Sequence, residues 1–142
     1  MTGIFFAFLG LLFFSAFFWQ EDKRKEKTEP LFFCGVIGPE RTPAFEAGKV
    51  LFKQNCASCH NKNMRDNLAG PALKGTAQRW ANYPEQDLYN WIRNSQKMIT
   101  DGHPRAQVLW MEWSPTVMTA FPRLTDEDIA NILGYIKGMS EY

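Results

Sequence analysis

One five-residue motif constrains this chain more than any other feature, because it requires a prosthetic group inside the fold. Residues 56–60 read Cys-Ala-Ser-Cys-His, and the spacing C-x-x-C-H is the attachment signature of a c-type haem. Residues three and four positions apart share one face of a helical turn. We therefore expect Cys56 and Cys59 to form thioethers with one covalent haem c, and His60 to bind its iron as the proximal ligand.

Two other kinds of site use a C-x-x-C pair: a zinc site and a redox dithiol. A zinc site needs four ligands, and the only other cysteine is Cys34, far upstream of the motif. A thioredoxin-like dithiol does not use a histidine directly after its second cysteine. The pattern therefore favours haem over both alternatives.

Length and charge narrow the classes of protein further. A chain of 142 residues has room for one small domain. Its net charge is +1, and no basic stripe is interleaved with aromatic residues, so we expect no nucleic-acid partner. We divide the chain into an N-terminal membrane anchor (1–20), a linker with a short apolar patch (21–41) and a haem-binding domain (42–142).

The anchor is predicted from an uncharged apolar segment. Residues 3–19 contain no charged side chain, and as a helix they would span roughly 25 Å, at the short end of what a bilayer core requires. A cleaved secretory signal is one alternative, but no Lys or Arg precedes the segment and no small-residue cleavage pattern closes it. A lipoprotein acylated at Cys34 is another, although Phe32 and Phe33 stand where lipobox sequences carry small residues.

The linker bears on orientation. Residues 21–29 carry four basic and four acidic side chains, as solvated linkers do, and the apolar patch at 31–38 is too short to span a bilayer. We expect this patch to lie on the membrane surface or against a partner subunit. The positive-inside rule mildly prefers the basic residues in the cytoplasm. Haem c, however, is attached on the far side of the energy-conserving membrane, so we expect a haem domain in the periplasm, tethered to a bacterial inner membrane.

Helical periodicity and capping signals dominate after residue 41, and no strand of convincing length is present. Thr42-Pro43 is typical of a helix start, and Thr125 with Asp128 forms a capping-box-like pair before an apolar stripe. We therefore predict an all-α domain. Its expected helices span residues 43–55, 76–80, 84–99, 105–112 and 125–139.

An electron-carrying haem iron needs a second axial ligand, and the chain offers several sulfur and nitrogen donors. Met98 and Met139 lie in expected helices, where core filling is the simpler role. Met111 and Met118 precede the last helix, and the residue pattern alone does not choose between them. The full set of candidates is Met64, Met98, Met111, Met118, Met139 and His103.

Several motifs together resemble the class I c-type cytochromes, in the small bacterial monohaem subgroup with His and Met ligands. The motifs are residues 56–60, Gly-Pro-Ala-Leu at 70–73, Met-Thr-Ala-Phe-Pro at 118–122 and a terminal helix at 124–137, so the resemblance covers about 44–139. It implies a cytochrome c-like helical fold with Met118 as distal ligand. Many relatives have Pro after this ligand, whereas this chain has Thr119.

The resemblance also implies supporting contacts. The carbonyl of Pro71 should accept a hydrogen bond from Nδ1 of His60, which fixes the imidazole tautomer. Gly48 and Phe52 should meet Tyr135 where the first and last helices cross. Donors to the haem propionates are expected among Arg79, Trp80, Trp91 and Trp113.

An electron carrier, and not an enzyme, is the function that these features imply. Ligation by His and Met raises the haem potential, and no small-molecule substrate is expected. The expected partners are a quinol-oxidising complex and a haem-copper oxidase, within a respiratory assembly such as alternative complex III. The alternative is a haem enzyme or gas sensor with an open iron, or with a bis-His iron through His103.

Overall fold

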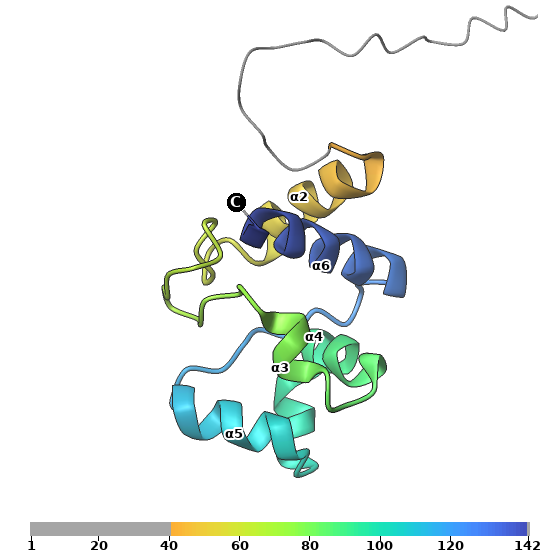
Figure 1. Ribbon diagram of the computed structural model, residues 1–142. Coiled ribbons are helices and arrows are strands. Elements are labelled where there is room, and N and C mark those ends of the chain that lie inside the picture. Colours follow the sequence, from red (N-terminus) through yellow and green to blue (C-terminus); the bar gives the residue numbers. More distant parts are fainter. Residues whose placement is uncertain (1–40, 142) are drawn as a thin grey trace, which may run out of the picture. The chain divides into compact units, whose positions relative to one another are not determined.

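The computed structural model describes residues 41–141, and within that range it is all-helical, as predicted. The expected membrane anchor, residues 21–40 of the linker and Cys34 lie outside the described residues. None of the described helices is both long and apolar enough to cross a bilayer. The helices are α2 (Pro43–Asn55), α3 (Thr76–Trp80), α4 (Glu85–Thr100), α5 (Pro104–Trp113) and α6 (Asp126–Glu141) (Figure 1).

The crossing of α2 and α6 forms one half of the core (Figure 1). Thr42 caps α2, because its hydroxyl accepts a hydrogen bond from the backbone N–H of Phe45 at 3.1 Å. Gly48 lies where the helices are closest: a Cβ there would be 2.0 Å from the carbonyl oxygen of Asn131. The rings of Phe52 and Tyr135 lie 5.4 Å apart beside this contact, so the crossing has the residues that the resemblance implies.

The second half of the core lies among α3, α4, α5 and the start of α6. Trp80, Leu88, Ile92, Ala106 and Ile129 are buried there together. The helix α4 is not continuous, because Asn94 has non-helical backbone angles (φ −159°, ψ 81°). No sequence signal predicted this interruption.

The segments outside the helices carry the two candidate axial ligands. One joins α2 to α3 and contains His60, and the other joins α5 to α6 and contains Met118. The helix expected at 105–112 spans Pro104–Trp113, so Met111 lies in a helix and only Met118 lies in the connecting segment. At the end of that segment, Thr125 and Asp128 exchange hydrogen bonds of 2.9–3.1 Å as a capping box for α6.

Candidate haem site

The two cysteines lie on a turn that continues directly from α2. The backbone N–H groups of Cys59 and His60 donate to the carbonyl of Cys56 at 3.1 and 2.9 Å. Neither cysteine forms a disulfide within the described residues; Cys56 is buried and Cys59 is exposed. Burial, with a smaller effect from Cys59, raises the pKa of Cys56 to about 11. The Cys56 side chain is therefore a neutral thiol at physiological pH.

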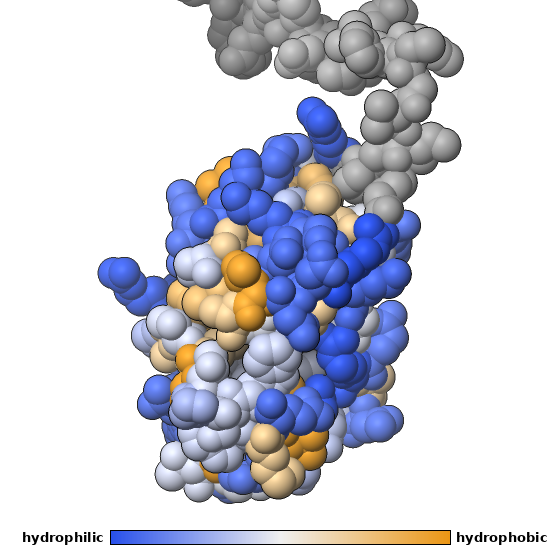
Figure 2. Space-filling view, turned by 90° about the vertical axis from the view of Figure 1, so that its left-hand side faces the viewer, coloured by the Kyte–Doolittle hydropathy of each residue, from blue (hydrophilic) through white to orange (hydrophobic). Residues whose placement is uncertain are grey.

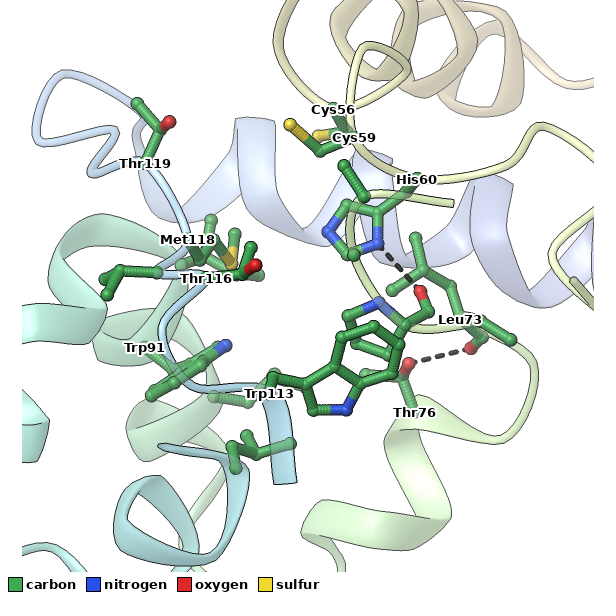
Figure 3. A pocket seen from close by; sticks show the side chains of 18 of the residues that line it. Cys56, Cys59, His60, Leu73, Thr76, Trp91, Trp113, Thr116, Met118 and Thr119 are labelled. Atoms are coloured by element: carbon green, nitrogen blue, oxygen red, sulfur yellow. Dashed lines mark hydrogen bonds between the residues drawn. The ribbon is translucent and has the colours of Figure 1, made fainter. Parts of the chain in front are cut away.

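His60 is buried and held by its backbone partner. Its Nδ1 lies 2.8 Å from the carbonyl oxygen of Pro71, so Nδ1–H donates and Nε2 is left free to accept (Figure 3). Burial lowers the pKa of His60, and the hydrogen bond to Pro71 opposes this only in part. The result is a neutral imidazole, the form that binds a metal. Gly70 packs against the ring, since a Cβ there would be 2.8 Å from Cε1 of His60.

Arg79 forms hydrogen bonds to the loop that contains Pro71. Its guanidinium donates to the carbonyls of Lys74 at 2.5 Å and Ala72 at 3.0 Å, and to the hydroxyl of Thr76 at 3.0 Å. Arg79 is one of the four residues among which we expected donors to the haem propionates. The structure places it in the lining of the cavity described next, but with its terminal nitrogens bonded to this loop.

The predicted site residues surround a single cavity of about 380 Å³, a volume within the range of small-molecule and cofactor sites. Cys56 and Cys59 lie at one end, Trp91 and Trp113 lie toward the other, and Met118 faces His60 across it (Figure 3). Figure 2 shows the face of the molecule that lies on the left-hand side of Figure 1. On that face, apolar and weakly polar side chains gather between hydrophilic ones. The lining includes all the predicted residues, namely Cys56, Cys59, His60, Pro71, Arg79, Trp80, Trp91, Trp113 and Met118.

The structure separates the five candidate methionines. Met64 and Met139 belong to the packing between α2 and α6, and Met98 is buried in the second half of the core. Met111 is 71% exposed. Of these five residues, Met118 is the one that lines the cavity.

His103 is placed away from the cavity lining. Its Nε2 lies 3.1 Å from a carboxylate oxygen of Asp87, and its ring stacks on Trp80 with the ring centres 5.8 Å apart. Its side chain is largely buried. It contributes to packing behind Trp80.

Arg105 is a cavity residue that the sequence interpretation missed. It lines the cavity from the first turn of α5, and its Nε is buried without a hydrogen-bond partner among the described residues. Burial, and then the nearby charge of Arg105, lower the pKa of Arg79, while Glu112 opposes the shift. Arg79 and Arg105 both line the cavity and their charges interact. Such cations fit the carboxylates of a haem, as the thiols and the neutral imidazole fit its vinyl groups and its iron. The residues present therefore fit a covalent haem c.

The comparisons with known proteins give the same cofactor. The cytochrome c family model matches residues 45–140. A cytochrome c from Rhodothermus marinus is similar in structure, with a TM-score of 0.57 and 28% identity over 75% of this chain and 87% of that one. An engineered cytochrome c from the same organism, bound to a carbene intermediate, has a TM-score of 0.54 and 26% identity over 76% and 88%. No curated protein sequence matches.

Proposed function

This chain belongs to the cytochrome c family and carries a covalently attached haem c, and we propose that it is a membrane-tethered electron carrier. It would relay electrons between a quinol-oxidising complex and a haem-copper oxidase. One observation carries the proposal: His60 and Met118 face each other across one apolar cavity, so both residues could supply a donor to the iron of a bound haem. An iron with both positions filled suits electron transfer better than substrate binding.

The bound haem supplies a one-electron couple between its ferric and ferrous states. The chain's own residues set the conditions for this couple. His60 presents a neutral imidazole because Nδ1 donates to Pro71, and Met118 supplies a thioether. The apolar lining would keep water from the iron of a bound haem, and Arg105 would offer a cation to its propionates. No proton transfer is required of these groups.

The tether and the partners are proposed from sequence features outside the described residues. The apolar segment at 3–19 supports a retained anchor in a bacterial inner membrane, with the haem domain in the periplasm. The apolar patch at 31–38 supports residence in a larger respiratory assembly, of which alternative complex III is one type. No small-molecule substrate and no nucleic acid enter this function.

The test is the coordination of the iron in the full chain, purified in detergent from the membrane fraction. The wild type is expected to be low-spin and not to bind carbon monoxide when reduced. Met118→Ala is expected to be high-spin and to bind carbon monoxide. Met111→Ala, a matched change at an exposed methionine outside the cavity, is expected to behave as the wild type.

Two results would contradict the proposal. Rapid binding of carbon monoxide by the wild type would show an open iron, which is the property of the haem enzyme or gas sensor. Recovery of the holoprotein in the soluble fraction would contradict the tether.

A further inference from the structure

The interruption of α4 at Asn94 changes the hydrogen bonds of its neighbours. In a continuous helix, the N–H of Lys97 would donate to the carbonyl of Arg93 four residues earlier. Here the N–H of Lys97 donates to the side-chain oxygen of Asn94 at 3.0 Å. The carbonyl of Arg93 instead accepts the backbone N–H of Phe121 at 3.0 Å. The bend thus turns a helix-internal acceptor toward the segment that contains Met118.

The residues on both sides of Asn94 add further bonds to the same segment. Ser95 is fully buried, and its hydroxyl donates to the carbonyl of Met118 at 2.9 Å. Arg93 donates through Nε to the carbonyl of Leu124 at 3.0 Å, and its guanidinium forms an ion pair with Asp126. Two residues of α4 therefore bond to the segment at Met118, Phe121 and Leu124, and to Asp126 at the start of α6.

We propose that Ser95 and the bend at Asn94 are positioning elements that hold Met118 against the haem iron. The proposal rests on the proposed function, in which Met118 is the distal ligand. Residues 115–125 lie between α5 and α6 and form no helix or strand, so the position of Met118 depends on these bonds. A fixed backbone keeps the thioether at the iron, and an external ligand must then displace a donor that is already in place.

Imidazole provides the measurement, because it competes with Met118 for ferric iron. A hydrogen bond that contributes about 1 kcal/mol net corresponds to about a fivefold change in an equilibrium constant. Ser95→Ala should therefore raise the affinity of the ferric full chain for imidazole about fivefold, as followed by the shift of the haem absorption bands. Ser140→Ala is the matched control, since this hydroxyl bonds to the carbonyl of Ile136 within α6 at 2.6 Å. Its imidazole affinity should equal that of the wild type.

Asn94→Ala separates positioning from general stability. Asn94 is exposed, and alanine at this position removes the acceptor that caps the second part of α4 at the N–H of Lys97. A straightened α4 would return the carbonyl of Arg93 to Lys97 and release Phe121. The variant is therefore expected to melt at a lower temperature and to bind imidazole more tightly. Thr42→Ala, which removes the corresponding cap of α2, should also lower the melting temperature but leave the affinity for imidazole unchanged. Equal imidazole affinities in the two variants would refute the positioning role. Asn94→Ala also tests the proposal if Ser95→Ala does not fold.

Met118→Ala distinguishes the two ways in which the proposal can fail. If this variant binds imidazole much more tightly than the wild type while Ser95→Ala and Asn94→Ala do not, Met118 remains the ligand and the positioning role is refuted. If Met118→Ala and the wild type bind imidazole equally, the iron is open in both. That result overturns the proposed function together with the positioning role.

Discussion

Replacing Gly48 with alanine tests whether the close crossing of α2 and α6 limits the stability of the domain. The new Cβ would lie 2.0 Å from the carbonyl oxygen of Asn131 and 3.0 Å from Cβ of Tyr135. Because Cβ atoms essentially never approach other atoms closer than 3.0 Å, the helices must separate by about 1 Å. A gap of this size forfeits about a quarter to a half of the dispersion attraction between facing atoms, among them the rings of Phe52 and Tyr135.

The expected loss of unfolding free energy is about 2 kcal/mol. Overpacking a well-packed contact costs about 1–3 kcal/mol, and the upper part of that range applies because the obstacle is backbone, which has no alternative rotamer. The higher helix propensity of alanine offsets at most about 1 kcal/mol of this loss of unfolding free energy. For a domain of this size, the melting temperature should fall by about 10 °C.

Gly134→Ala is the matched control for this change. Gly134 also lies inside a helix, α6, but a Cβ there would meet nothing within 4 Å. Only the propensity remains, so the melting temperature should rise by about 5 °C. Thermal unfolding of the haem-loaded full chain, followed by circular dichroism, measures both variants. The reasoning is refuted if Gly48→Ala melts at or above the wild type, or if both variants lose stability equally.

Two further changes test the cavity charge and the cap of α6. Arg105→Gln is expected to lower the reduction potential of the haem, because a buried cation disfavours the more positive ferric state. Redox titration measures the potential, and Arg123→Gln, at an exposed position, is the control. An unchanged potential in Arg105→Gln would contradict the role of this charge. Hydrogen bonds from the N–H and hydroxyl of Thr125 lower the pKa of Asp128 in the folded protein. The ionised carboxylate therefore stabilises the fold at pH values above its ordinary pKa. This stabilisation is lost as the pH falls through the lowered pKa of the folded protein. Asp128→Asn should therefore show a weaker decline of melting temperature in acid, and an identical pH profile would argue against the cap.

The helices were predictable because their signals are local. Thr42 caps α2 three residues from its partner Phe45, and Thr125 caps α6 three residues from Asp128. The attachment motif needs only five adjacent residues. Each of these features lies within about one helical turn, where local side-chain hydrogen bonds fix the backbone independently of the rest of the fold.

The features that sequence did not indicate depend on distant partners. In the sequence, Asn94 is a polar residue inside a helical pattern, as expected of a solvent-exposed position. The role of the bend at Asn94 depends on the carbonyl of Arg93, which accepts the backbone N–H of the distant residue Phe121. The sequence places Arg105 at the start of a short expected helix and gives it no functional role. Only the folded structure shows that its Nε is buried and that its side chain lines the cavity.

The two sides of the haem site differ in the same way. His60 is held by Pro71, 11 residues away in the same loop, whereas Met118 is held by Ser95, 23 residues away, and Arg93 reaches 33 residues to Asp126. Long-range bonds require the surrounding helices to be in place, whereas short-range bonds form within one loop. His60, the proposed proximal ligand, is thus fixed within one loop, whereas the position of Met118, the proposed distal ligand, depends on the packing of α4 against the segment before α6. Ligand exchange at the iron should therefore occur on the distal side, where Ser95 and Asn94 are proposed to act.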